Sequence, residues 1–346
     1  MLKTGQSDLA NNLLDRISSA WPENQWCDAK LIVAVSGGCD SVALLHCLQL
    51  LRKRTGGSGE SIALYCNHNT RDACAAEADF VQQLARQLNC QYATTNFQDA
   101  SNNEGPSENQ LREFRYDSFV QTAQKFGARY VVTAHHADDQ LETILFRIFR
   151  GTGLSGLTGV PRIRTDGDIS FVRPLLDIRK CELQKLLVDF DQPFCQDDSN
   201  LESVYTRNYL RNEILPAVRH RFGPQSEDAI LRLGDQAAEI QQFLDSIAEP
   251  IFEKSVSSRD GKASVELDGW SSQHSIIVSQ LVRLLWKRME LPEREMTRHK
   301  WRQVSQLIMD PNPPASLQLP GNVTLSRIGD KLIVESTPPF SRKNDG

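Results

Sequence analysis

The 346-residue sequence lacks three patterns: a membrane-spanning segment, a signal peptide for export, and the cysteine pairs that commonly bind zinc or an iron–sulfur cluster. It contains no uninterrupted run of about 18 apolar residues, the length that a membrane-spanning helix needs. Its first residues do not show the charged and then apolar segments of a signal peptide. Its eight cysteines form no Cys-x-x-Cys pair, so we interpret them as small core residues in a reducing compartment. These absences predict a globular cytoplasmic protein with no membrane partner and no zinc or iron–sulfur site.

A glycine-containing turn near the start of the chain matches neither of two common nucleotide-binding patterns. No lysine follows Gly37 and Gly38 as in a Walker-type loop, and these two adjacent glycines do not have the Rossmann Gly-x-Gly-x-x-Gly spacing. Instead, a buried strand predicted at 31–35 leads through Ser36, Gly37, Gly38, Cys39, Asp40 and Ser41 into apolar residues at helical spacing. Such a turn presents unpaired backbone N–H groups to an anion, and a carboxylate suits Mg²⁺. We therefore predict that these six residues bind phosphate groups and that Asp40 binds a metal ion. The alternative is a tight strand-to-helix turn that binds no ligand.

The next part of the chain alternates predicted strands and helices, which is typical of a Rossmann-like, doubly wound parallel sheet of the α/β class. The strands are expected at 31–35, 62–66, 91–95, 130–134 and 171–177. In such sheets, ligands bind outside the carboxyl ends of the strands. Polar clusters follow three of these strands, at 36–41, 67–68 and 135–139. The sequence therefore predicts one site that all three clusters share.

The pattern changes near residue 222 to helices with fewer strands. Because Phe222-Gly223-Pro224 interrupts a helix, we place the boundary at 219–224 and predict an N-terminal catalytic domain at 1–220. Residues 221–346 then form a smaller, mainly helical domain, with helices at 226–248, 275–289 and 298–309 and a terminal hairpin at 323–334. The tail from Pro338 is expected to be disordered.

Four stretches together resemble the tRNA(Ile)-lysidine synthases, a family of N-type ATP pyrophosphatases, or PP-loop proteins. They are residues 36–41, 135–143 running into 150–157, 173–176, and 198–200 with 205–211. The resemblance implies an adenine nucleotide alpha hydrolase-like fold, with ATP and Mg²⁺ as cofactors. It implies that ATP adenylates the C2 oxygen of the wobble cytidine of tRNA(Ile) with a CAU anticodon and that the ε-amine of free L-lysine displaces AMP. The product, lysidine, changes decoding from AUG to AUA.

The candidate catalytic residues combine this resemblance with the chemistry of the side chains. The resemblance assigns lysine recognition to Asp139, and Asp139 shares a helix face with Glu142 because the two are three residues apart. Asp138, one position off, is expected to point elsewhere and to cap the helix. His135 is included because it follows a strand beside the phosphate loop, although a His pair at a strand end is more often structural.

Three arginines, Arg112, Arg207 and Arg211, are expected around the tRNA and its target base, because guanidinium groups suit both phosphate and a base carbonyl. The net charge of −5 argues mildly against a nucleic-acid partner, but a local basic face is compatible with an acidic total. We expect the C-terminal domain to bind tRNA, although its basic runs could equally be solvated helix faces. A homodimer is one possible oligomeric state.

Two other functions remain as alternatives. The first is another PP-loop tRNA-modifying enzyme such as a thiolase, but thiolases of the two-thiocytidine type use Cys-x-x-Cys pairs. The second is a nucleotide-binding regulator without catalysis, against which the presence of Asp40, His135, Asp139 and Glu142 argues. A test for pyrophosphate release separates enzyme from regulator.

Overall fold

The computed structural model describes residues 8–68, 73–97, 107–195, 206–259, 262–293 and 295–336. The chain divides into two compact units, one up to Asp235 and one from Gln236. The predicted boundary at 219–224 coincides with the break between α9 (Leu215–Phe222) and α10 (Gln225–Ser255), and the two units divide further along, inside α10. The tail from Pro338 and the stretch at 198–200 lie outside the described residues.

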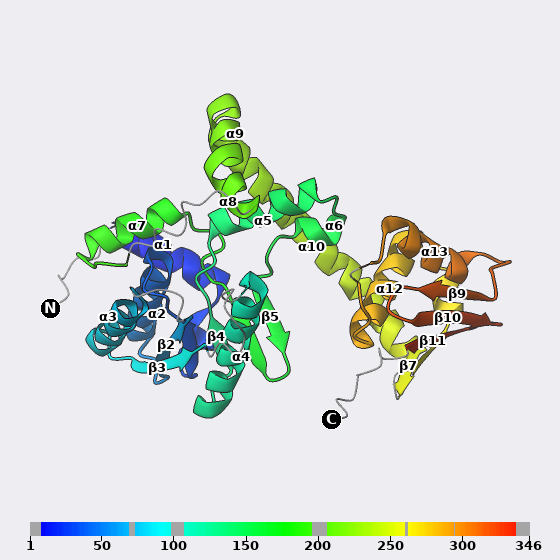
Figure 1. Cartoon of the computed structure of the whole chain (residues 1–346), viewed down its shortest axis with the longest axis horizontal. Coiled ribbons are helices and arrows are strands. Elements are labelled where there is room, and N and C mark those ends of the chain that lie inside the picture. The colour runs from blue at the N-terminus through cyan, green and yellow to red at the C-terminus, as the bar shows by residue number, and fades with distance from the viewer. Residues whose placement is uncertain are drawn as a thin grey trace, which may run out of the picture. The chain divides into compact units, whose positions relative to one another are not determined.

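The first unit is built on a six-stranded sheet with the order β3-β2-β1-β4-β6-β5 (Figure 1). The bounds are β1 (Leu31–Ala34), β2 (Ser61–Asn67), β3 (Gln91–Asn96), β4 (Tyr130–Val132), β5 (Ile163–Asp166) and β6 (Ile169–Val172). All neighbouring pairs are parallel except β5 with β6. The predicted doubly wound parallel sheet is confirmed. The strand order reverses between β1 and β4, which is where such sheets bind ligands.

Helices cover both faces of this sheet. Their bounds are α1 (Asp8–Ala20), η1 (Glu23–Gln25), α2 (Cys39–Thr55), α3 (Ala73–Gln87), α4 (Glu108–Phe126), α5 (Ala137–Phe149), α6 (Leu154–Leu157) and α7 (Lys180–Asp189). Leu31 and Val33 of β1 point into the core that α1, α2, α3 and α7 share, whereas Ile32 points into a second core under α4. This alternation is what a strand buried on both faces requires. After α7 come α8 (Thr206–Tyr209) and a π-helical turn, η3 (Leu210–Ile214).

The edge of the sheet differs from the expectation of one strand over 171–177. The strand β6 ends at Val172, and β5 and β6 form an antiparallel hairpin across Gly167, whose φ of +57° favours glycine. The sequence pattern missed β5 because all four of its residues are exposed.

The second unit contains a five-stranded antiparallel sheet with the order β7-β8-β11-β10-β9. The bounds are β7 (Val256–Arg259), β8 (Lys262–Glu266), α11 (Asp268–Ser271), α12 (Ser275–Arg288), α13 (Arg298–Met309), β9 (Ser316–Leu319), β10 (Val323–Ile328) and β11 (Lys331–Ser336). The predicted hairpin is confirmed, because Ile328 pairs with Lys331 across Gly329 and Asp330. The strands β7, β8 and β9 were not foreseen. No helix among the described residues of either unit combines the length and the apolar character that crossing a membrane requires.

Candidate active site

Hydrogen bonds from side chains within the turn that follows β1 hold this turn in shape. The Ser41 hydroxyl donates to the Gly38 carbonyl at 2.9 Å and accepts from the Ser36 N–H at 3.2 Å. Gly37 has a φ of +88°, a conformation that favours glycine, and its carbonyl accepts from the Cys195 N–H at 2.9 Å. The loop is therefore held in shape at the N-terminus of α2, where an anion binds favourably.

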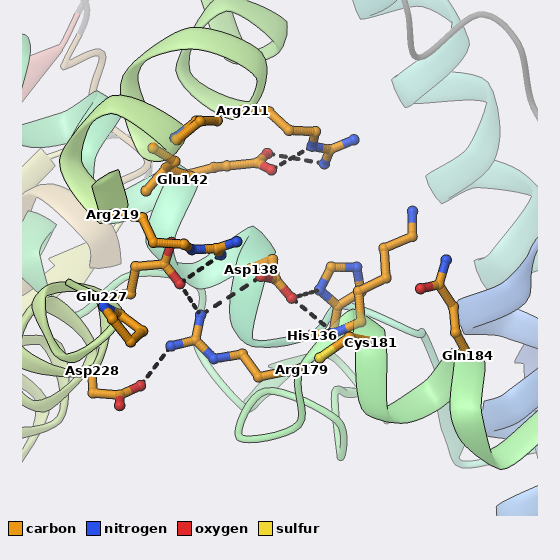
Figure 2. Close-up of a pocket in the computed structure, with 14 residues that line it drawn as sticks. His136, Asp138, Glu142, Arg179, Cys181, Gln184, Arg211, Arg219, Glu227 and Asp228 are labelled. Atoms are coloured by element: carbon orange, nitrogen blue, oxygen red, sulfur yellow. Dashed lines mark hydrogen bonds and ion pairs between the residues drawn. The ribbon is translucent and has the colours of Figure 1, made fainter. Parts of the chain in front are cut away.

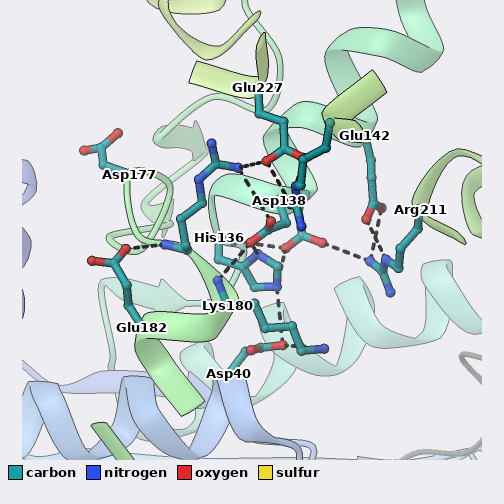
Figure 3. A network of polar contacts seen from close by, with 12 residues as sticks. Asp40, His136, Asp138, Glu142, Asp177, Lys180, Glu182, Arg211 and Glu227 are labelled. Atoms are coloured by element: carbon teal, nitrogen blue, oxygen red, sulfur yellow. Dashed lines mark hydrogen bonds and ion pairs between the residues drawn. The ribbon is translucent and has the colours of Figure 1, made fainter. Parts of the chain in front are cut away.

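The next two residues, Cys39 and Asp40, begin α2 and have different environments. Burial, with the nearby Asp40 carboxylate, raises the pKa of the Cys39 thiol to about 12, so it is neutral and only its backbone can contribute to phosphate binding. Asp40 Oδ2 lies 3.4 Å from His136 Nε2 and 3.8 Å from Lys180 Nζ (Figure 3). Asp40 Oδ1 is buried and has no hydrogen-bond partner among the described residues. Such an oxygen fits a bound cation.

The two histidines that follow β4 carry opposite protonation states. His136 is 3% exposed, and its ring lies 3.4 Å from both Asp40 and Asp138 and 3.6 Å from Asp139. Burial by itself lowers the pKa of His136, but these three carboxylates raise it to about 10. Burial, helped by nearby Arg173, lowers the pKa of His135 to about 4. At neutral pH His136 is therefore an imidazolium and His135 is neutral.

Sequence reasoning selected His135, whereas the structure places His136 among the carboxylates. His135 Nδ1 lies 3.0 Å from the Thr133 hydroxyl, and no ion pair among the described residues joins its ring to Asp40. One sequence signal could have indicated His136. It stands three residues before Asp139, the spacing of a helix N-cap and the side chain that reaches back to it.

Asp138 points elsewhere than Asp139, as expected, but the expectation that Asp138 caps α5 was wrong. His136 is the N-cap of α5, so Asp139 occupies the third helical position, and its carboxylate accepts from the His136 N–H at 3.0 Å. Asp138 instead accepts from the Lys180 N–H of α7 at 2.8 Å and lies 3.6 Å from Arg179. Burial raises the pKa of Asp138, but the bonds from His136 and the Lys180 N–H outweigh it and hold the pKa well below its usual range.

Glu142 and Arg211 form an ion pair (Figure 3). Arg211 donates to the Glu142 carboxylate through Nε at 2.6 Å and through Nη2 at 3.1 Å, and Glu142 is 5% exposed. Arg211 Nη2 also lies 3.6 Å from Asp139 Oδ1. Asp139 and Glu142 thus face the same side of α5, as their spacing predicts. Burial raises the pKa of Glu142 in spite of Arg211. Arg211 belongs to the π-helical turn η3, a local structure that occurs often at functional sites.

These side chains border a pocket of about 680 Å³ (Figure 2). His136, Asp138, Glu142 and Arg211 line one part of it. The rest of the lining comes from α7, α9 and the start of α10. It includes Arg219 and also Arg179, Lys180, Glu227 and Asp228, four residues that sequence reasoning did not select. The wall thus alternates acidic and basic groups, which suits a ligand that carries both signs of charge.

Two predicted residues lie elsewhere in the first unit. Arg112 is exposed on α4, with its guanidinium 5.9 Å from the Tyr116 ring, and Arg207 is exposed on α8, 5.9 Å from the Phe146 ring. Neither is among the described residues that line the pocket. The structure therefore brings Asp40 and Asp139 together around His136, and Arg211 connects Asp139 with Glu142. It does not bring Arg112 or Arg207 to this cluster.

The described residues do not by themselves build a closed metal site. No three His, Cys, Asp or Glu side chains in this part of the chain are arranged to hold a metal ion. A magnesium ion at Asp40 would therefore need phosphate and water oxygens to complete its ligands, which is how this ion commonly binds beside nucleotides.

The fold and the loop define a class of protein, and sequence comparison identifies the same class. The family model of the PP-loop domain (ATP_bind_3) matches residues 10–218, so the protein is a PP-loop ATP-binding protein. The solved U34-tRNA thiolase NcsA from Methanococcus maripaludis shares the fold, with a TM-score of 0.56 at 14% identity over 67% of this chain and 79% of that one.

Curated relatives narrow the class further. A tRNA(Ile)-lysidine synthase from Rhodopirellula baltica is 31% identical to this chain, and the aligned region covers 85% of this chain and 83% of the relative. The enzyme of that name from a Nostoc species is 30% identical, covering 82% and 80%. The chain belongs to the tRNA(Ile)-lysidine synthase family of PP-loop ligases. It spans 66% of the length of the Clostridioides difficile relative, with 29% identity.

Proposed function

We propose that this protein joins free L-lysine to C2 of the wobble cytidine of tRNA(Ile) with a CAU anticodon, using ATP and Mg²⁺. The product is lysidine, and decoding changes from AUG to AUA. The observation that carries the proposal is the cluster of Asp40, Asp139 and Glu142 beside the phosphate loop, at the point where the strand order reverses. Family membership supplies the tRNA substrate.

In the first step, the C2 oxygen of cytosine attacks the α-phosphorus of ATP, the bond to the β-phosphate oxygen breaks and pyrophosphate leaves. The loop at 36–41 holds the departing phosphates. The His136 imidazolium and Lys180 lie within 4 Å of Asp40, so they provide positive charge where negative charge develops. Mg²⁺, held by the unpartnered Asp40 oxygen, would neutralise phosphate charge when bound.

In the second step, the ε-amine of lysine attacks C2, the C2–O bond breaks and AMP leaves. Free lysine is almost entirely ammonium near neutral pH, so the site must attract a cation and accept its proton. Asp139 and Glu142 supply the negative charge, and the raised pKa of Glu142 suits it to accept a proton. His136 already holds a proton and cannot take another, whereas neutral His135 can accept a hydrogen bond.

Arg112 and Arg207 are proposed to contact the tRNA outside the pocket, together with the second unit. Both guanidinium groups are exposed on the first unit, where phosphate can reach them. If they hold phosphates, alanine variants should bind tRNA more weakly, with a shallower dependence on salt. Unchanged binding and kinetics in both variants would remove them from the site.

The homodimer and the cytoplasmic location also stay proposals, which sedimentation and cell fractionation test.

Both rival functions predict different chemistry. The solved thiolase is described with its 4Fe–4S cluster, while the described residues of this chain contain no cluster of metal-binding side chains. A regulator without catalysis would bind ATP but release no pyrophosphate.

The decisive experiment incubates the protein with labelled lysine, ATP, Mg²⁺ and unmodified tRNA(Ile). We expect label in the tRNA together with one pyrophosphate and one AMP for each lysine joined, and none when the wobble cytidine is replaced by uridine. Label that appears in both tRNAs, or pyrophosphate release without any label, would refute the proposed reaction.

A further inference from the structure

Four charged residues on the pocket wall take no part in the two steps above. Arg179 is the N-cap of α7, Arg219 belongs to α9, and Glu227 and Asp228 begin α10 (Figure 2). Glu227 is 3% exposed and accepts from Arg179 Nη1 at 3.1 Å and from Arg219 Nε at 2.9 Å and Nη2 at 3.0 Å. Arg179 Nη2 also donates to Asp228 at 2.6 Å. We call these four residues the outer quartet.

The outer quartet has two anchored members and two exposed ones. Glu227 is buried and fixes both guanidinium groups, and the Arg179 side chain is only 20% exposed. The side chains of Arg219 and Asp228 are 57% and 58% exposed. The bonds of Arg219 to Glu227 use Nε and Nη2, and that of Asp228 to Arg179 uses Oδ1. The Arg219 guanidinium is therefore oriented by the buried Glu227, and the Asp228 carboxylate by the half-buried Arg179, while both keep atoms for a ligand.

A cation and an anion on the wall of one pocket are what the head group of a free α-amino acid requires. Its α-carboxylate pairs well with an arginine and its α-ammonium with a carboxylate. The same pocket is lined elsewhere by Glu142, which together with Asp139 is proposed above to attract the second ammonium group. An amino acid with a cationic side chain thus matches the charges on both parts of the wall.

We propose that Arg219 and Asp228 bind the α-carboxylate and the α-ammonium group of the amino-acid substrate, and that Glu227 and Arg179 are positioning residues for them. This assignment rests on the proposed function and adds the part of lysine that does not react. It explains how the site tells free lysine from a simple diamine, which offers the same nucleophile. A charge-assisted hydrogen bond of this kind corresponds to roughly 10-fold to 100-fold in kcat/KM.

The test compares three amines as substrates for transfer to adenylated tRNA. They are lysine, cadaverine, which lacks the α-carboxylate, and 6-aminohexanoate, which lacks the α-amine. We expect wild-type protein to prefer lysine to each analogue by at least 10-fold in kcat/KM. Arg219→Gln should bring the ratio of lysine to cadaverine close to one, and Asp228→Asn should do the same for lysine against 6-aminohexanoate. The loss should appear in KM for lysine rather than in kcat.

Each ratio is measured within one variant, so partial loss of folded protein does not change it. Arg221→Gln, on the same helix as Arg219 but outside the pocket lining, makes the same change of charge and should keep the wild-type ratios. Arg219→Lys should restore part of the preference over cadaverine. The assignment is wrong if wild-type protein has the same kcat/KM for cadaverine as for lysine. It is also wrong if both variants keep the wild-type preferences. Wild-type protein that joins none of the three amines to tRNA refutes the proposed function itself, and the assignment with it.

Discussion

Replacement of Arg211 by glutamine should destabilise the first unit in a manner that depends on pH. The change removes both hydrogen bonds to Glu142, a residue that is 5% exposed, and leaves a buried charge without its partner. Breaking a buried pair in this way costs about 3 to 5 kcal/mol. Because the Arg211 side chain is 33% exposed, we expect the lower end, about 3 kcal/mol at pH 8.

The sign of the pH dependence follows from the raised pKa of Glu142. A carboxyl group with a higher pKa in the folded state binds its proton more tightly there, so folding loses stability as pH rises through the two pKa values. Without Arg211 the folded pKa rises further, and the variant loses more stability at pH 8 than at pH 5. The loss changes by about 1.4 kcal/mol for each pH unit in which only the folded variant holds the proton.

Hydrogen exchange of α5 peptides, followed by mass spectrometry over a urea series, reports the stability of the first unit separately from the second. The matched control is the double variant Arg211→Gln with Glu142→Gln, which removes both charges and should stay within about 1 kcal/mol of wild type at both pH values. A loss below about 1 kcal/mol at pH 8 in the single variant, or a loss equal at pH 5 and pH 8, would contradict the account of Glu142 as a buried charge held by Arg211.

Three further predictions concern the reaction. Asp40→Asn should abolish formation of adenylated tRNA, measured as pyrophosphate release, while tRNA binding stays near normal; adenylation at the wild-type rate would exclude Asp40 from the ATP site. Asp139→Asn should raise the lysine requirement steeply, so that adenylated tRNA accumulates in a quenched-flow assay, whereas blocked adenylation with an unchanged lysine dependence would assign Asp139 to the ATP–magnesium site instead. Gly37→Ala places a side chain where φ is +88° and Cys195 Sγ is 3.2 Å away, so ATP affinity measured by calorimetry should fall by about 10-fold, for about 1 to 2 kcal/mol of strain. Gly56→Ala, at a φ of +70° with nothing within 4 Å, should reduce stability alone, and equal ATP affinities in the two variants would argue against a special role for Gly37.

The parts of the fold and site that could be predicted from the sequence are those with local signals. A run of apolar residues, a turn with two glycines and a helical pattern follow one another at 31–48, so the phosphate loop needed no knowledge of the rest of the chain. The shared face of Asp139 and Glu142 likewise depends only on helical spacing. Strands β5 and β7 were missed because nearly all of their residues are exposed and their few apolar residues are isolated. No alternation of apolar and polar residues therefore marks these strands in the sequence.

The roles of individual charged residues depended on tertiary packing and could not be predicted in this way. Whether His135 or His136 meets Asp40 is decided by which residue becomes the N-cap of α5, a shift of one position that sequence patterns rarely resolve. Asp138 finds its partner in the first N–H of α7, which is remote in sequence. The pairing of Arg179 with Glu227 joins α7 to α10 and has no signature in either segment.

The position of Lys180 has a consequence for how nucleotide binding and folding are connected. The phosphate loop has no lysine of its own, and the ammonium group nearest to Asp40 among the described ion pairs, 3.8 Å away, belongs to α7. That charge reaches the loop only after α7 has packed into the core that it shares with α2. A ligand that binds the assembled arrangement stabilises it by mass action. Binding of ATP should therefore slow hydrogen exchange in α7 as well as in the loop. The nucleotide then stabilises the packing of a helix that is distant in sequence from the glycines of the loop.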